Sequence, residues 1–454
     1  MAAGNIGMGE KVLAIASAEW GSDPRRILAQ TPMSKQQVVA LALCGALNAL
    51  DGFDVLSISF ASPGIAAEWH VKPAALGLVL SMEVFGMAAG SVLLGQLADR
   101  IGRLSTTILC LVIMAIGMLA TPQSTGVGFL TLTRLFTGLG IGGMLAATNA
   151  LAAEYTNARW RSAGIAIMAA GYPLGAVIGG TIASRMLVHG DWRNVFYLGA
   201  GLALVLLPLV PLLMREPVGA LLQRRPANAL SLINRTMRAF GHDEIDHLPD
   251  VDPAAPKIGL RDLFGPKLGA TTGLLAMAYF THIITFYFVV KWIPKIVVNM
   301  GFAPSAAGGV LVWANVGGLI GALLFSLASL RLPLRGSLVA MMLASAVMVA
   351  VFGHAPADLT VLSLAAAGAA FCTNSVIVGF YALIAQSFPT AVRGGGTGFV
   401  IGVGRFGSAA GPITAGALFQ AGLGLPAVAA LMAVGSLIAA GMLLVLPRGE
   451  TQDH

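Results

Sequence analysis

Twelve apolar runs, each long enough for a helix to cross a lipid bilayer, dominate this chain of 454 residues. Such a helix needs roughly 20 residues to span the hydrocarbon layer. Composition agrees, because 57% of the residues are hydrophobic and only 10% are charged, against about a quarter charged in soluble proteins. The sequence therefore predicts an all-α membrane protein with twelve transmembrane helices. We place them at about 37–60, 74–97, 104–121, 127–152, 162–187, 193–214, 268–291, 304–329, 334–353, 358–387, 395–420 and 425–446.

One long connection divides the twelve runs into six plus six. It begins with the basic stretch REPVGALLQRRPANALSLINRTMRAFG, which predicts a single amphipathic helix, and continues as an acidic, proline-containing segment. Two similar glycine-rich stretches, GYPLGAVIGG and GRFGSAAGPITAG, lie six runs apart and indicate two pseudo-symmetric six-helix bundles. The predicted parts are an N-tail (1–36), an N-terminal bundle (37–214), a linker (215–267), a C-terminal bundle (268–446) and a C-tail (447–454).

The distribution of basic residues predicts the orientation in the membrane. With the N-terminus inside, 20 of the 27 Lys and Arg residues fall on inner segments and five on outer ones. By the positive-inside rule both termini are then cytoplasmic. The same distribution accounts for the net charge of +7, so no nucleic-acid partner is expected. The first 20 residues include Glu10, Lys11 and Glu19 and have no continuous apolar core, so we expect no cleavable signal peptide.

The stretch GQLADRIGRLS (95–105) lies in the turn between the second and third runs. An aspartate there can cap a helix and pair with an arginine, and a glycine permits a tight bend. The alternative is a charged turn that only sets topology. The pattern resembles the signature loop of the major facilitator superfamily, in which this loop gates the cytoplasmic side. The counterpart at 325–337 has Ser329 in place of an acid. The resulting gating candidates are Gly95, Asp99, Arg100, Gly102, Arg103, Glu154 and Arg393.

Further motifs resemble the aromatic acid:proton symporter family of that superfamily. They are DGFD in the first run, RLFTGLGIGG in the fourth, WIP at 292–294 and FPTAVRGGGTGFVIGVGRFG at 388–407. The resemblance covers nearly the whole chain. It implies the major facilitator fold, uptake of an aromatic carboxylate such as a hydroxybenzoate together with a proton, and a bacterial-type inner membrane. It also implies that Asp51, Asp54 and Arg405 matter for transport.

The residues themselves support a role for buried acids. Asp51 and Asp54 lie three apart on one helical face, and Gly52 between them allows a close neighbour. Burial favours the protonated form of a carboxyl group, and acids within a membrane are candidates for function by default. Glu83 is a third proton-coupling candidate. We expect Arg134, also considered as a substrate ligand, to form a charge cluster with Asp54 and Glu83. For Glu83 and Arg134 a purely structural ion pair is the alternative.

Arg405 lies near the middle of the eleventh run, where an unpaired guanidinium suits recognition of a ligand carboxylate. The rival interpretation is a fixed ion pair with Asp51 or Asp54. Aromatic residues of the seventh run suit a planar ring, although such residues more often serve packing, as does a buried histidine. We expect Lys291 to extend its amine to the outer interface. The other substrate-binding candidates are His282, Tyr287, Asn315, Asn374 and Tyr381; the asparagines and Tyr381 are equally suited to binding a neighbouring helix.

Enzyme chemistry is not indicated. Gly138, Gly140 and Gly143 satisfy G-x-G-x-x-G, but they lie within an apolar run that no strand precedes, so we interpret them as helix-packing glycines. We find no metal-ligand cluster, catalytic triad or ATP-binding loop, and expect no cofactor besides the co-transported proton. The expected function is import of an aromatic acid by a monomer in the lipid bilayer. The alternatives are a symporter for another organic acid or a sugar, and a proton-driven efflux antiporter.

Overall fold

The computed structural model describes residues 23–188, 191–249, 263–265, 268–389 and 392–447. Over these residues twelve helices of 18 to 34 residues follow one another. Their bounds are α3 (Lys35–Glu68), α4 (Pro73–Ile101), α5 (Arg103–Ala120), α6 (Val127–Tyr155), α7 (Arg161–Met186), α8 (Arg193–Leu213), α11 (Gly269–Asn299), α12 (Pro304–Ala328), α13 (Leu334–Gly353), α14 (Leu359–Ser387), α15 (Arg393–Gln420) and α16 (Leu425–Val445).

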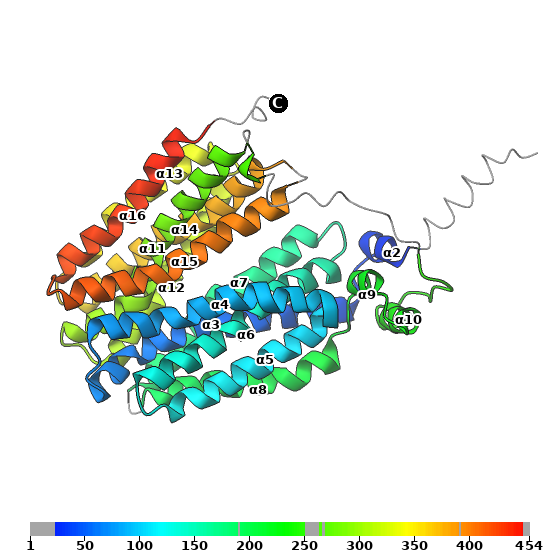
Figure 1. Ribbon diagram of the computed structural model, residues 1–454, viewed down its shortest axis with the longest axis horizontal. Helices are drawn as coiled ribbons and strands as arrows, with labels where there is room; N and C mark the ends of the chain where they lie inside the picture. The colour runs from blue at the N-terminus through cyan, green and yellow to red at the C-terminus, as the bar shows by residue number, and fades with distance from the viewer. Residues whose placement is uncertain (1–22, 189–190, 250–262, 266–267, 390–391, 448–454) are drawn as a thin grey trace, which may run out of the picture.

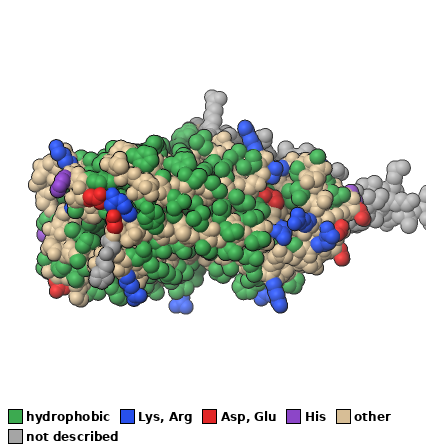
Figure 2. Space-filling model, turned by 90° about the horizontal axis from the view of Figure 1, so that it is seen from below, with side chains coloured by type: hydrophobic (Ala, Val, Ile, Leu, Met, Phe, Trp, Pro, Cys, Tyr) green, Lys and Arg blue, Asp and Glu red, His purple; other side chains and the backbone are tan. Residues whose placement is uncertain are grey.

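Eleven of these helices have the length and mean hydropathy of a membrane span. The exception among the described helices is α15, whose 28 residues include two arginines and many glycines that lower its hydropathy. On the face shown in Figure 2, hydrophobic side chains cover the middle of the molecule and charged ones gather toward its two ends. This distribution fits a bundle that crosses a bilayer lengthwise.

The helices form two six-helix halves, α3–α8 and α11–α16, which occupy separate parts of Figure 1. Corresponding helices pair in the same way within each half. In the first half α4 packs on α6, α3 on α7 and α5 on α8; in the second α12 packs on α14, α11 on α15 and α13 on α16. The fold is therefore the predicted pair of pseudo-symmetric bundles.

The two halves meet mainly through α4 with α15 and α7 with α12. We call the end where α3 begins and α16 ends the termini end, and the opposite end the far end. At the far end the Ala74 N–H donates to Gln420 Oε1 at 3.2 Å, and Ser81 Oγ donates to the Ala409 carbonyl at 2.7 Å. A Cβ on Gly416 would lie 3.2 Å from the Gly77 Cα. The described halves are thus closed against each other at the far end.

Between the halves the chain forms two short helices rather than the single amphipathic helix predicted. Helix α9 (Val218–Arg224) ends at Arg225, which has a left-handed φ of 45°, and α10 (Ala229–Ala239) follows Pro226. A proline is not compatible with a helix interior, because its ring removes a hydrogen bond and clashes with the preceding turn. A further short helix, α2 (Pro24–Gln30), lies within the predicted N-tail. The rest of that tail (1–22), linker residues 250–262 and the C-tail from 448 lie outside the described residues.

Candidate functional site

Asp51 and Asp54 occupy the middle of α3, a helix that starts with a capping box: Ser34 N–H donates to Gln37 Oε1, and Gln37 N–H to Ser34 Oγ. Gly52 lies against the backbone of Tyr172 on α7, where a Cβ would be 2.7 Å from the carbonyl carbon. The predicted close neighbour of Gly52 is thus present.

Both carboxyl groups of this pair are enclosed by protein. Asp51 is 1% exposed and Asp54 0%, and none of their four oxygens has a hydrogen-bond partner. An isolated charge in such surroundings is costly, so a proton on these groups lowers the cost. Asp51 lies within electrostatic reach of Arg405, whereas Asp54 lies within reach of Glu83 and Arg134. The pair therefore links two different groups of charged side chains.

Glu83, Arg134 and Lys291 form a fully buried ion cluster beside Asp54. Glu83 Oε1 lies 3.6 Å from Arg134 Nη1, and Glu83 Oε2 lies 3.5 Å from Lys291 Nζ. Glycines bring the backbones of α4 and α6 together: a Cβ on Gly138 would collide with the backbone of Glu83. The predicted charge cluster exists, and its glycines are helix-packing residues as predicted.

Arg134 is held by several further partners. Its Nη2 donates to the hydroxyls of Thr121 and, at 3.0 Å, Thr137. Its guanidinium carbon lies 4.7 Å from the centroid of the Phe196 ring, a cation–π contact. Fully buried beside Glu83, Arg134 is placed to balance the acids of the cluster.

Lys291 differs from the sequence prediction. It was expected to extend to the outer interface, but its side chain is 0% exposed. It belongs to α11 in the second half, yet its amine donates to the Val55 carbonyl on α3 and pairs with Glu83 on α4, both in the first half. The sequence gives the position of Lys291 along α11 but no sign of the acid that faces it across the halves.

Arg405 lies in the middle of α15 and is partly buried. No described acid lies within 4.0 Å of it, so the fixed ion pair with Asp51 or Asp54, which was the rival interpretation, is absent from this structure. Tyr172, Tyr279 and Tyr287 all lie within electrostatic reach of its guanidinium. Tyr172 comes from the first half and the other two from α11, so tyrosines of both halves lie within electrostatic reach of Arg405. Tyr172 was not predicted; only its place in the glycine-rich repeat could have indicated it.

The remaining substrate-binding candidates contact protein in different ways. His282 is buried, with Nδ1 3.0 Å from Ser436 Oγ and Nε2 3.0 Å from the Thr373 carbonyl, which is the geometry of a packing histidine. Asn315 Nδ2 donates to its own helix, and Asn374 Nδ2 donates to α12. Tyr381 is 45% exposed, and its hydroxyl lies 3.5 Å from that of Tyr279. Of these four, Tyr381 has the direct link to the tyrosines near Arg405.

At the termini end the predicted gating loop is tightly bent. Gly102 has a φ of 107°, and a Cβ there would lie 2.8 Å from the Glu216 carboxylate oxygens. Glu216 accepts the N–H groups of Arg103 at 2.7 Å and Leu104 at 3.1 Å, so it caps α5. Asp99 was expected to supply such a cap, but it is exposed. Glu216 was missed because it follows the sixth span, far away in sequence.

The other gating candidates divide into paired and exposed residues. Arg103 forms an ion pair with Glu154 at the end of α6, and Asp99 attracts Arg103 electrostatically. Arg100 is exposed. Gly95 has room for a side chain, because a Cβ would lie 3.8 Å from its nearest neighbour. Arg393 is exposed at the start of α15 in the second half, where its Nε lies 3.4 Å from the Phe388 carbonyl.

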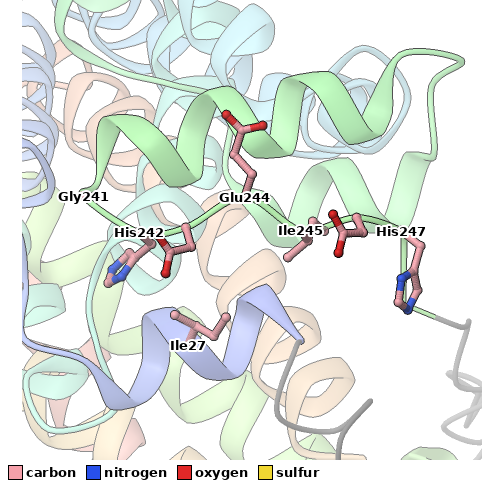
Figure 3. A pocket seen from close by; sticks show the side chains of 8 residues that line it. Ile27, Gly241, His242, Glu244, Ile245 and His247 are labelled. Atoms are coloured by element: carbon pink, nitrogen blue, oxygen red, sulfur yellow. The ribbon is translucent and has the colours of Figure 1, made fainter.

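Two surface hollows lie at the termini end, away from Arg405. One, of about 310 Å³, is lined by Ile27 and by the loop that carries His242, Glu244 and His247 (Figure 3). The other, of about 420 Å³, lies against Glu216 and Arg224. Within the described part of the chain no three His, Cys, Asp or Glu side chains are arranged to hold a metal ion. Neither hollow is lined by the buried acids or by Arg405.

Twelve helices in two similar halves, with buried charges at mid-depth between them, define the class of polytopic membrane transporters. Residues 41–358 match the Major Facilitator Superfamily, and the chain belongs to this family of transporters, which are not enzymes. The inward-open xylose transporter XylE from E. coli has the same fold, with a TM-score of 0.70 and 17% identity over 92% of this chain and 98% of that one.

Curated relatives of similar length were also found. A gallate transporter from Pseudomonas putida is 29% identical over 88% of this chain and 90% of its own length. A 4-hydroxybenzoate transporter, PcaK, from Acinetobacter baylyi is 28% identical over 85% of this chain and 86% of its own. The chain is thus similar over most of its length to transporters of aromatic acids, in agreement with the resemblance of its motifs.

Proposed function

We propose that the protein imports an aromatic carboxylate of the hydroxybenzoate type together with a proton, by alternating access. The observation that carries this proposal is Arg405: no described acid forms an ion pair with it, and tyrosines from both halves lie within its electrostatic reach. A guanidinium binds a carboxylate in a bidentate manner, and tyrosine rings offer faces and hydroxyls to a planar hydroxylated ring. The names of the gallate and 4-hydroxybenzoate relatives support the same substrate class.

Asp51 and Asp54 are the proposed proton acceptors, coupled with Glu83. Their carboxyl groups lack hydrogen-bond partners, so they are available to a proton. Because neighbouring carboxyls titrate as a unit, the proton belongs to the group rather than to one residue. Asp51 lies within electrostatic reach of both Asp54 and Arg405. It is therefore a neighbour of the proposed proton site and of the proposed carboxylate site.

The proposed setting is the inner membrane of a bacterial cell, with both termini in the cytoplasm and the monomer as the working unit. The bacterial relatives and the concentration of basic residues on one side support it. In this orientation the far end faces outward. The halves are closed there, so in this orientation the structure is closed toward the outside. No cofactor is proposed besides the transported proton.

Uptake into proteoliposomes tests the function and the stoichiometry together. A monoanion carried with one proton is electroneutral, so a gradient of one pH unit supports at most about tenfold accumulation, and a membrane potential adds nothing. Radiolabelled benzoate, 4-hydroxybenzoate and gallate are offered with the lumen one pH unit more alkaline. Accumulation of at least one acid supports the proposal. Accumulation only of aliphatic acids or sugars, or expulsion of the acids, would replace it with another symporter or an antiporter.

Arg405→Ala and Arg405→Lys test the carboxylate site, with Arg331→Lys at an exposed position of the same half as the matched control. A charged hydrogen bond contributes about 1.5–3 kcal/mol, so we expect Arg405→Ala to weaken binding by about tenfold or more and to abolish counterflow. Arg405→Lys keeps the charge but loses the bidentate geometry, and is expected to be intermediate. Unchanged substrate binding in Arg405→Ala contradicts the carboxylate role.

A further inference from the structure

Lys291 is the one described lysine that forms an ion pair between the two halves. Its backbone moves with α11 in the second half, while its amine is seated between the Val55 carbonyl and Glu83 in the first. Lys291 lies eight positions before Asn299, where α11 ends at the far end. Opening of the far end moves α11 away from α3 and α4, and a lysine cannot keep both contacts once the helices part.

The charges around Glu83 balance only while Lys291 is present. When both carboxyl groups are ionised, Asp54 and Glu83 carry two negative charges, which the two positive charges of Arg134 and Lys291 balance; all four side chains are fully buried. Two tyrosines, Tyr172 on α7 and Tyr287 on α11, also lie within electrostatic reach of Glu83 and are neutral. Withdrawal of Lys291 leaves two carboxylates with one guanidinium. A buried net charge is costly, and one proton on the carboxyl pair removes it.

We infer that Lys291 and the transported proton alternate as the counter-charge of the Asp54–Glu83 pair. When the halves close at the far end, the amine enters and the proton leaves; when they open there, the amine withdraws and a proton takes its place. Lys291 is thus a positioning residue that makes proton binding depend on conformation. This inference rests on the proposed proton symport and assigns its coupling step.

The direction of the exchange fits import. With the far end outward, the proton is taken up while the site faces outside and is displaced once the site faces the cytoplasm. Asp51 lies closer to the termini end than Asp54 on the same helix and within its electrostatic reach. It is therefore placed to receive the displaced proton on the side toward the cytoplasm.

The test compares pH-driven accumulation with counterflow for Lys291→Met in the full-length protein. Without the amine, the carboxyl pair keeps its proton in both conformations, so one pH unit no longer drives uptake. We expect the accumulation ratio to fall from about ten to about one, while exchange of labelled for unlabelled acid continues. Lys295→Met, one turn further along α11, is the matched control and should accumulate like the unaltered protein.

The double variant Glu83→Gln with Lys291→Met removes one charge of each sign and so leaves no buried charge unbalanced. It therefore separates a loss of proton coupling from a loss of stability. It should also lose accumulation and keep counterflow, even if Lys291→Met alone is unstable. Accumulation of about tenfold in either variant overturns the inference, as does a proportional loss of accumulation and counterflow in both. Failure of the unaltered protein to accumulate any acid instead overturns the proposed symport itself.

A distance measurement gives a second readout. Spin labels on cysteines that replace Ala74 and Gln420 report the closed contact between the halves at the far end. Because the open state binds one more proton, acidification should favour it: the distance should lengthen as the pH falls in the otherwise unaltered protein. In the double variant Glu83→Gln with Lys291→Met it should not respond to pH. An equal response in both proteins contradicts the exchange.

Discussion

Gly52→Ala tests whether the contact between α3 and α7 positions the buried acids. The added Cβ would lie 2.7 Å from the carbonyl carbon and 2.9 Å from the Cα of Tyr172. Favourable carbon contacts lie at about 3.5–4.0 Å, so the helices must separate by about 1 Å. Both partners are backbone, and no change of rotamer relieves the clash.

The matched control is Gly45→Ala on the same helix, whose Cβ would meet only the Met168 Cα at 4.0 Å. Replacing a helical glycine with alanine stabilises by about 1 kcal/mol, and both variants share this gain. Overpacking costs about 1–3 kcal/mol, and Gly52→Ala alone carries that cost. The expected difference in stability between the two variants is therefore about 1–3 kcal/mol, with Gly45→Ala the more stable.

Thermal unfolding of both variants in detergent measures this difference, and uptake into proteoliposomes measures its effect on function. Displacement of α7 moves Tyr172 relative to Arg405, and a misfit of about 1.4 kcal/mol corresponds to tenfold in affinity. We expect Gly52→Ala to be the less stable variant and to show at least about tenfold weaker uptake. If Gly52→Ala matches Gly45→Ala in both assays, the close packing at this position does not position the site.

Three further predictions concern other residues. His282→Ala should lower thermal stability by about 1–3 kcal/mol, because two buried partners lose their hydrogen bonds, while the KM for uptake stays unchanged; a raised KM would show substrate contact. Burial raises the pKa of Glu216 above its usual 4.5, so its ionisation opposes folding and stability should increase as the pH falls through that raised value. Glu216→Gln should flatten this part of the pH–stability curve, and an unchanged slope would show that other groups cause it. Gly102→Ala should be destabilising, because a left-handed φ disfavours alanine and the Cβ meets Glu216; stability equal to that of Gly95→Ala would contradict this.

Features written in local sequence were predictable. Apolar runs gave the helices, and the spacing of Asp51 and Asp54 gave their shared face, because both depend on residues close together in the chain. The cluster of Asp54, Glu83 and Arg134 followed from their similar depth in neighbouring spans. Depth along a helix is simply a count of residues, so these predictions needed no knowledge of rotation about the helix axes.

Features that depend on which sides of two helices pack against each other were not predictable. Lys291 was expected at the interface but reaches Glu83 across the halves, and Glu216 rather than Asp99 caps α5. His282 occupies the packing position that was the alternative interpretation. A single sequence gives the position of such residues along a helix but not the direction in which they point from its axis. An ion pair between the two halves depends on the position and on the direction.

The cap that Glu216 provides has a consequence for how the protein is made. Helix α5 is completed by a residue that the ribosome adds only after the sixth span. Helices α9 and α10 and the residues that follow pack apolar side chains, including Phe240 against Tyr155, onto the same half. A nascent chain that ends at the membrane surface after α8 therefore still has unsatisfied N–H groups at the start of α5. The smallest fragment expected to assemble as an independent first half extends beyond its last span, to about residue 248, where the apolar packing of this half ends.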